Sequence, residues 1–526
     1  MTESNASADP NTASLPLNSP TATNQIPTSQ NYPTRTETDS IGSLEIPDTA
    51  YWGVHTARAN ENFPIARRPV SVYPDFVRAF ACVKQAAARA NAEIGALDDQ
   101  RANLIDAACE EIKAGKLHDQ FAVGVIQGGA GTSTNMNANE VITNRALEIA
   151  GRSKGDYAFI HPNDHTNHSQ STNDTYPTAI KIALAFSLQN LLGELRLLAD
   201  AFAAKGREFA HIVKVGRTQL QDAVPMTLGQ EFNAFATTLR EDVQRLEEAV
   251  ALLGEVNMGA TAIGTSINAP VGYKEAVIKH LREITGLDLK TAGDLVESTS
   301  DTGVFITFSG ALKRSALKMS KIANDLRLLS SGPQAGIGEI NLPARQAGSS
   351  IMPGKVNPVI PEAVSQVAYS VAGADVTVSM AVEAGQLQLN AFEPIIAHSL
   401  FQSITWLERA CQTFRINCVN GITANEAHIE DTVDRSVTVI TALAPVIGYV
   451  AAAKLAKEAL AKNESIADLV VEHELLERDE LGEILRPERL TGMAADDSVD
   501  NTATSTEAVP RDEVTTELPI IPDPEG

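Results

Sequence analysis

The feature that most constrains the fold is a set of long segments in which apolar residues recur with helical spacing. Residues 74–94 and 101–114 place apolar side chains at i, i+3, i+4 and i+7, which predicts two amphipathic helices. Longer segments, several of them apolar on more than one face, lie at 178–212, 227–256, 303–330, 360–385 and 394–417. Such helices are buried in bundles, and a bundle that continues across subunits buries them most simply. The sequence therefore predicts a mostly α fold in a homo-oligomer.

Composition narrows the possible partners. With 43% hydrophobic but only 5% aromatic residues, the chain suits packed helices better than β-sandwiches. A formal net charge of −24 argues against nucleic acid and against an anionic membrane surface, so an anionic substrate needs a local positive pocket. No stretch of about 18 apolar residues runs uninterrupted, which argues against a membrane span. The few cysteines lack metal-binding spacing, which predicts reduced thiols, no metal site and a cytoplasmic protein.

Both ends of the chain differ from its middle. The N-terminal residues have neither a basic start nor an apolar stretch, so they are not a secretory signal. The C-terminal residues are acidic and proline-rich, a composition that cannot bury enough apolar surface to fold. We expect disordered tails at both ends, over residues 1–34 and, with an acidic composition, over 494–526. Between them we expect an N-terminal helical domain (35–175), a central helix bundle (176–428) and a small C-terminal helical domain (429–493) broken by a proline at 445.

The joints between the helices hold the polar residues. Gly, Ser, Thr and Asn gather at 127–140, 161–174, 216–225, 259–270 and 348–362. Three of these joints place short neutral donors where a helix begins: Thr132, Ser133, Ser171, Thr172, Asn173, Thr218 and Gln219. One such cluster is an ordinary helix cap. Several together, with helix N-termini and a lysine, would form a pocket suited to a small dianion.

The lysine lies in GSSIMPGKVNPVIPE at 348–362, which has too many prolines and glycines for a helix or a paired strand. Lys355 is its only cation and Asn357 offers two amide donors, so the two side chains suit a carboxylate. A capping turn with a solvated lysine is the simpler interpretation of this segment alone. Its glycines and prolines also favour a segment that closes over a substrate.

Two other motifs carry no chemistry on their own. GGAG at 128–131 is followed by no Gly-Lys-Ser/Thr, so nucleotide binding is not predicted. His161, His165 and His168 lie in a turn with Pro162 and match no metal-binding motif, so we expect neither a metal nor another cofactor.

Taken together, the joints resemble the shared blocks of the fumarase/aspartase superfamily. The matching stretches are GSSIMPGKVNP, QGGAGTSTNMNANEVI, HTNHSQSTND and GRTQLQDAVPMTLGQEF, and the resemblance runs from about residue 35 to about residue 492. It implies a three-domain, nearly all-α subunit whose long central helices form the core of a homotetramer. It also implies that loops of three subunits build each active site, where a dicarboxylate substrate binds.

The resemblance assigns roles residue by residue. Ser349 matches the general base that takes a proton from the carbon next to a carboxylate. Matches to substrate-binding groups are Thr132, Ser171, Thr172, Asn173, Thr218, Lys355 and Asn357, with Ser133 and Gln219 beside them. We assign supporting roles to Gly348, Ser350 and Glu362, the last of which pairs with an active-site histidine in fumarases.

The branch of the superfamily follows from the flanking residues. Fumarases usually have histidine where this chain has Gln219, and a departing hydroxide needs an acid more than departing ammonia does. NPVIPE at 357–362 and EAGQLQLNAFEP at 383–394 also resemble aspartases. We therefore expect an aspartate ammonia-lyase that converts L-aspartate to fumarate through an aci-carboxylate. HPNDH at 161–165 resembles a fumarase turn, which makes a class II fumarase the alternative; argininosuccinate and adenylosuccinate lyases fit less well.

A different class of function remains open at this point. A lens or scaffold protein can keep this fold without activity, but the intact set of Ser349, Lys355 and Asn357 argues against that interpretation. The two tails either add a partner function or serve only solubility.

Overall fold

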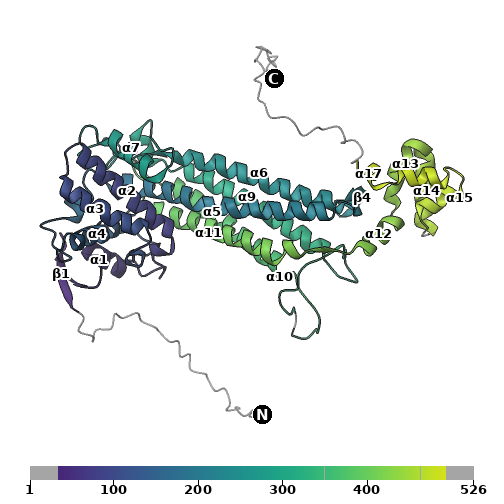
Figure 1. Ribbon diagram of the computed structural model, residues 1–526, viewed down its shortest axis with the longest axis horizontal. Coiled ribbons are helices and arrows are strands. Elements are labelled where there is room, and N and C mark those ends of the chain that lie inside the picture. The colour runs from purple at the N-terminus through teal and green to yellow at the C-terminus, as the bar shows by residue number, and fades with distance from the viewer. Residues whose placement is uncertain (1–32, 349, 463, 493–526) are drawn as a thin grey trace, which may run out of the picture. The chain divides into compact units, whose positions relative to one another are not determined.

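A computed structural model describes residues 33–348, 350–462 and 464–492, and helices dominate it (Figure 1). The helices are α1 (Val54–Asn62), α2 (Pro74–Glu93), α3 (Asp99–Lys113), α4 (Thr132–Ile149), α5 (Thr172–Glu208), α6 (Leu228–Ala251), α7 (Tyr273–Thr285), α8 (Leu295–Ser300), α9 (Val304–Leu329), α10 (Val359–Glu383), α11 (Glu393–Asn417), α12 (Glu426–Arg435), α13 (Ile440–Ile447), α14 (Tyr449–Lys462), α15 (Ile466–Glu472), α16 (Arg478–Ile484) and α17 (Pro487–Leu490). The strands are β1 (Thr34–Thr38), β2 (Ser43–Pro47), β3 (Val213–Thr218), β4 (Gln221–Thr227), β5 (Glu255–Val256), β6 (Lys290–Thr291), β7 (Ile340–Asn341) and β8 (Thr423–Ala424). The predicted mostly α class is confirmed.

The described residues divide into two compact units, each described here by itself. The first contains the chain up to residue 189 with residues 248–310 and 373–404, and the second contains the remainder. The boundaries fall inside α5, α6, α9, α10 and α11, so each unit holds one end of each long helix. The division into an N-terminal domain, a bundle and a C-terminal domain stays a prediction. The expected tails over 1–34 and 494–526 lie almost entirely outside the described residues.

Helix α5 departs from its predicted start. Periodicity placed the start near residue 178, yet the helix begins at Thr172 and continues through Pro177. A proline inside a helix leaves the carbonyl four residues earlier without its usual donor. Here that carbonyl belongs to Asn173, and the Asn257 side-chain amide donates to it at 3.0 Å. A tertiary hydrogen bond therefore compensates for the proline.

The first unit is built around an aromatic cluster. Helix α2 packs against α3, α4 and α7 (Figure 1). On its buried face, Phe76 contacts the rings of Phe80, Tyr176 and Phe401 with ring centroids 5.0 to 5.6 Å apart. Offset and edge-to-face ring contacts of this kind favour one packing arrangement over others. The cluster fixes the start of α5, and so the loop before it, on the rest of the unit.

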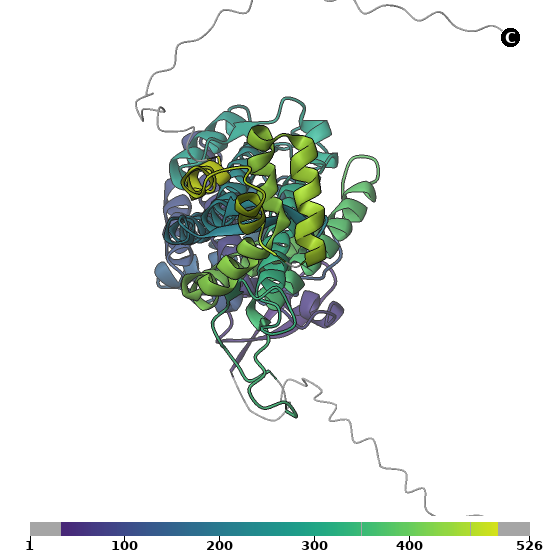
Figure 2. The ribbon, with the colours of Figure 1, turned by 90° about the vertical axis from the view of Figure 1, so that its right-hand side faces the viewer.

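The second unit has two cores. Phe202 on α5 packs against Phe232 and Phe235 on α6 and against Phe414 on α11. Near the C-terminus, α14 packs against α13 and α15 and these helices share a separate apolar core (Figure 2). The expected break at Pro445 is wrong, because α13 runs through that proline and ends before Gly448, whose φ is 84°. With a ψ of 147°, this residue cannot continue the helix, and glycine adopts such a conformation without a steric penalty.

Helix α5 is also the one described helix that is long and apolar enough to cross a membrane by length and composition alone. Half of its apolar window is buried inside the protein. Because a core helix passes the same test, this is weak evidence for a membrane span.

Candidate functional site

The predicted site residues divide between the two units. Those at the starts of α4 and α5 belong to the first unit, and those of the β3–β4 hairpin and the 348–358 loop belong to the second. Ser349, the predicted base, lies outside the described residues.

In the first unit, the starts of α4 and α5 are joined. Gly131 precedes α4 with a φ of 87°, and a Cβ added there would lie 2.3 Å from the ring of Tyr176 on α5. Only glycine therefore lets the two helix starts approach so closely. The Asn135 amide on α4 donates to the Thr172 hydroxyl on α5 at 3.1 Å. The structure thus brings the Thr132 cluster and the Ser171 cluster together.

Ser171 caps α5, as an isolated Ser-Thr-Asn cluster would suggest. Its hydroxyl accepts from the backbone N–H of Asn173 at 3.2 Å, and the Asp174 carboxylate accepts from the Ser171 N–H at 3.0 Å. This reciprocal pair is a capping box. Asp174 also accepts from the N–H groups of Gly259 and Thr261, which ties the polar joint at 259–270 to the same helix start.

The side chains of the other predicted groups point to specific partners. The Asn173 amide donates to the carbonyl of Ala262 at 2.7 Å, so its oxygen faces away from that bond. The Thr132 hydroxyl donates to the carbonyl of Gly129 at 2.7 Å. Thr132 is exposed, while Ser133, Thr172 and Asn173 are half-buried. Hydroxyls and amides therefore remain accessible at two helix N-termini, where the helix dipole favours an anion.

A buried lysine supports this region and was not predicted. Lys84 on α2 is fully buried, and its ammonium donates to Asn167 Oδ1 and Gln170 Oε1, both at 2.9 Å. Asn167 Oδ1 also accepts from Asn135 at 3.2 Å. A lysine in the apolar stretch ACVKQAAARA was the available signal, because lysine is almost never fully buried unless paired.

Burial sets the protonation of this support. Desolvation lowers the pKa of Lys84 to about 7, and the nearby Asp174 carboxylate opposes that change. Desolvation likewise raises the pKa of Asp174 to about 7, against the N–H groups of Ser171 and Thr261 and the charge of Lys84. Burial favours the neutral form of both groups. The charge of each group favours the charged form of the other.

In the second unit, Thr218 and Gln219 lie at the tip of the β3–β4 hairpin. The antiparallel register pairs Thr218 with Gln221, so Gln219 and Leu220 form a two-residue turn. Their φ angles are 54° and 63°, in the left-handed region that glycine, asparagine and aspartate usually occupy. Such strain costs on the order of 1 kcal/mol per residue and persists only where neighbouring structure imposes it. The polar joint predicted at 216–225 is thus a strained hairpin.

A cluster of charges lies at the base of that hairpin. Lys214 on β3 is buried, with its ammonium 2.6 Å from Glu231 and 2.7 Å from Glu339. Arg217, the residue before Thr218, lies 2.5 Å from the other oxygen of Glu339. Two cations and two carboxylates therefore balance in a region with little solvent. No sequence signal connected Glu339 with the hairpin.

The predicted lysine loop closes on itself (Figure 1). Gly348 N–H donates to the carbonyl of Lys355 at 2.8 Å, and the Asn357 amide donates to the carbonyl of Gly348 at 2.9 Å. Lys355 and Ser350 are exposed in the loop, and Asn357 is half-buried at its base. Glu362 lies in the first turn of α10, where a carboxylate favours the helix dipole. Asn357 thus has a structural bond beside its expected binding role.

Local hydrogen bonds hold the histidine turn. Residues Pro162–Thr166 form a π-helical turn, and His161 Nδ1 accepts from the N–H groups of Asn163 and Asp164. Among the described residues, no group of three or more His, Cys, Asp or Glu could hold a metal ion.

Comparisons with known proteins place this arrangement in a family. A family described as lyase matches residues 42–373, and one described as fumarase C C-terminus matches residues 439–492. An aspartate ammonia-lyase from Pseudomonas canavaninivorans is 56% identical over 457 residues, which are 87% of this chain and 96% of that protein. The aspartate ammonia-lyase of Escherichia coli K12 is 51% identical over the same shares of the two chains.

Solved structures agree with this placement. A fumarate lyase:delta crystallin from Brucella melitensis bound to cobalt has a TM-score of 0.85 and 55% identity, covering 87% of this chain and 99% of that one. A class II fumarase from Schistosoma mansoni has a TM-score of 0.81 at 33% identity, covering 86% of this chain and 98% of that one.

Proposed function

Because this chain belongs to the lyase family of the fumarase/aspartase superfamily, we infer that it catalyses the elimination of ammonia from L-aspartate to give fumarate. The observation that carries this function is the identity of 51 to 56% to aspartate ammonia-lyases over 87% of the chain. The identity to a class II fumarase is only 33%, which makes fumarate hydration the weaker of the two candidate reactions.

The proposed chemistry begins with removal of an unactivated proton. Ser349, as its alkoxide, takes the proton from the carbon next to one carboxylate of L-aspartate and becomes a neutral hydroxyl. The electron pair of the broken C–H bond moves into that carboxylate to give an aci-carboxylate dianion. Collapse of the dianion forms the double bond and expels ammonia from the neighbouring carbon in the anti direction. Ammonia leaves without needing a strong acid, which suits Gln219 in place of a histidine.

The proposed binding groups stabilise the negative charge of the substrate. Thr132, Ser133, Ser171, Thr172 and Asn173 offer neutral donors at the starts of α4 and α5, and both helix dipoles favour an anion there. Preorganised donors of this kind stabilise the extra charge that develops in the transition state. The absence of net positive charge on the whole protein makes these local groups the main source of attraction.

The second unit supplies the remaining groups in this proposal. Lys355 and Asn357 bind the substrate carboxylates, with Thr218 and Gln219 on the hairpin. Gly348 and Ser350 flank Ser349 in the sequence, and Glu362 supports the loop from the first turn of α10. The loop closes over the substrate and excludes water, which strengthens every polar contact in the site.

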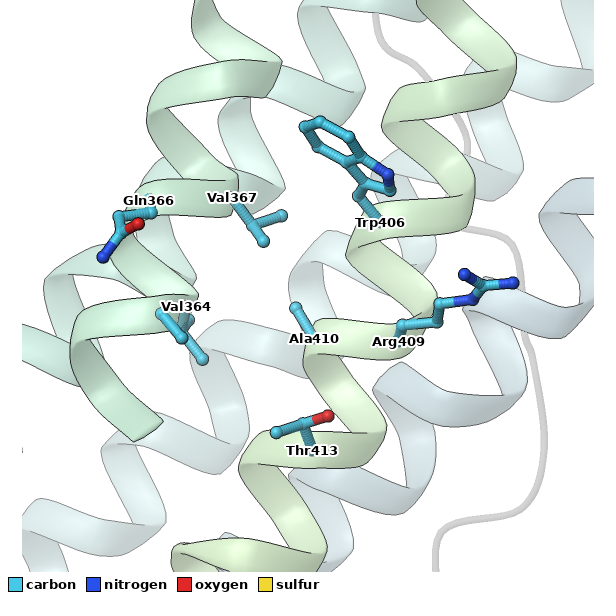
Figure 3. Close-up of a pocket in the computed structure, with 8 residues that line it drawn as sticks. Val364, Gln366, Val367, Trp406, Arg409, Ala410 and Thr413 are labelled. Carbon is cyan, nitrogen blue, oxygen red and sulfur yellow. The ribbon is translucent and has the colours of Figure 1, made fainter. Parts of the chain in front are cut away.

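A homotetramer with active sites shared between three subunits completes the proposal. In the first unit, Val376 and Met380 follow one face of α10 and are 58% and 68% exposed. In the second unit, Val364, Val367 and Trp406 line an apolar groove of about 510 Å³ between α10 and α11 (Figure 3). Large exposed apolar surfaces usually mark protein contacts, and a second copy of the same helix would cover this one.

The buried thiols support a cytoplasmic location. Cys82, Cys109, Cys411 and Cys418 are free and buried. This state suits a reducing compartment, so we place the enzyme in the cytoplasm.

Lys355→Ala tests the binding role directly. Loss of a charged donor to the developing dianion should lower kcat/KM for L-aspartate by about 100-fold or more. Lys457→Ala, which removes an exposed lysine from α14, is the matched control and should keep wild-type kinetics. Unchanged turnover in Lys355→Ala would remove the lysine loop from the mechanism.

A further inference from the structure

The hairpin tip needs an external support. Gln219 and Leu220 occupy the left-handed region without being glycine, and the side chains of Thr218, Gln219 and Leu220 are exposed, so packing at the tip does not hold them. A two-residue hairpin with such residues would relax unless its base were fixed. Within one chain, the support therefore comes from the strand that leads into the tip.

Glu339 is placed to give that support. Its two carboxylate oxygens meet two residues of β3, with Oε2 2.7 Å from the Lys214 ammonium and Oε1 2.5 Å from the Arg217 guanidinium. The side chain of Glu339 is only 2% exposed, so solvent screens these pairs weakly. Between the two cations, the ladder of β3 and β4 has an irregular register, which leaves this part of the strand with fewer regular backbone bonds.

The backbone of Glu339 is itself fixed. Its N–H donates to the carbonyl of Leu329 at 2.9 Å, and its carbonyl accepts from the N–H of Asn425 at 2.8 Å. The Asn425 amide also donates to the carbonyl of Gly338 at 2.6 Å. Hydrogen bonds therefore fix the backbone of Glu339 on both its N–H and its carbonyl. This restricts where its carboxylate can lie against the hairpin.

We propose that Glu339 is a positioning residue for the lyase reaction, which holds Arg217 and Lys214 so that the strained hairpin presents Thr218 and Gln219 to the substrate. The proposal rests on the proposed function of Thr218 and Gln219 as substrate contacts. Arg217 is the neighbour of Thr218 in the chain, so its ion pair sets the direction of the strand at the last residue before the turn. Without Glu339, the guanidinium of Arg217 loses this ion pair next to the proposed substrate contacts.

Glu231 provides a matched control. Its carboxylate lies 2.6 Å from the same Lys214 ammonium, but the Arg217 ion pair described here is with Glu339. Glu339→Gln and Glu231→Gln each remove one negative charge from the same cluster and keep the size of the side chain. Only Glu339→Gln removes the ion pair with Arg217, the residue next to Thr218.

Steady-state kinetics with L-aspartate test the proposal. We expect Glu339→Gln to raise KM about tenfold with a smaller change in kcat, because the hairpin groups bind substrate and transition state alike. Glu231→Gln should stay within about twofold of the wild type in both constants. In the double variant Glu339→Gln/Arg217→Gln, the rise in KM should match that of the worse single variant, because the ion pair between the two residues is already lost in each single variant. Wild-type KM in folded Glu339→Gln, or equal effects of the two glutamine variants, would overturn the proposal.

Amide hydrogen exchange over residues 213–227 separates this proposal from the proposed function. Exchange should be faster in Glu339→Gln than in the wild type and in Glu231→Gln, whatever reaction the enzyme catalyses. If wild-type protein forms no fumarate from L-aspartate, the proposed function fails while this comparison still decides the role of Glu339. Equal exchange in all three proteins overturns the positioning role. If Glu339→Gln does not fold, Arg217→Gln takes its place, because it removes the other member of the same ion pair.

Discussion

At the scale of single residues, the buried charged side chains are the part of the structure that the sequence pattern did not predict. Lys84 and Asp174 lie within apolar or capping stretches, and their partners come from segments far apart in the chain. The cap function of Ser171 follows from its local sequence because the capping box spans four residues. The role of Lys84 does not, because helical spacing shows which face is buried but not which polar atoms meet there.

Glu393 gives a pH prediction at this scale. It is fully buried, and desolvation raises its pKa from 4.5 to about 8 against the opposing charge of Lys181. The folded protein therefore holds a proton that the unfolded chain releases between those pH values. Its contribution to stability is present below pH 4.5 and is lost as the pH rises to about 8.

Glu393→Gln should remove this dependence. The free energy of unfolding of the wild type should fall, relative to the variant, by roughly 2 to 4 kcal/mol across that window. Denaturant unfolding of both proteins near the two ends of the window measures the difference. A difference that stays constant with pH would show that Glu393 is ionised in the folded protein throughout.

At the scale of elements, periodicity predicted the long helices but not the hairpin. Helices α6, α9, α10 and α11 begin and end within a few residues of the predicted positions. The β3–β4 hairpin lacks the Asn-Gly or Asp-Gly turn that marks hairpins in a sequence, since its turn residues are Gln219 and Leu220. Strain at a functional position is where local rules are expected to fail.

The lysine loop yields a prediction about shape. A Cβ on Gly348 would lie 2.6 Å from the carbonyl oxygen of Lys355, whereas a Cβ on Gly354, with a φ of 83°, meets nothing within 4 Å. Gly348→Ala should open the base of the loop and lower kcat/KM by about tenfold or more, because small displacements of binding groups are costly. Gly354→Ala pays only backbone strain and should lose less than about threefold.

Kinetics and thermal unfolding of the two alanine variants form the test. The unfolding midpoints should stay close to the wild type because both glycines lie in a solvent-facing loop. Equal losses of activity in the two variants would mean that closure at Gly348 does not shape the site.

At the scale of the whole molecule, the central question is assembly. The sequence predicted buried long helices, and the superfamily resemblance supplied a tetramer; neither fixes which surface is covered. In the first unit, the exposed apolar side chains of Val376 and Met380 on α10 support a subunit contact there. A single chain cannot reveal its partner by sequence pattern alone, because a buried helix face reads the same whether its neighbour belongs to the same chain or to another.

Met380→Asp should weaken that assembly. A carboxylate placed in an apolar contact loses its hydration without gaining a partner, so the variant should have a lower mass by light scattering and lower activity. Leu460→Asp is the control, because Leu460 on α14 is 69% exposed against 68% for Met380. A variant Met380→Asp with wild-type mass and activity would contradict the proposed interface.

The choice of substrate tests the proposed function. Purified enzyme is offered L-aspartate and L-malate separately, and the ultraviolet absorbance of fumarate is followed in each case. We predict fumarate from L-aspartate and none from L-malate. Fumarate from L-malate alone would contradict the account and assign the site to hydration chemistry.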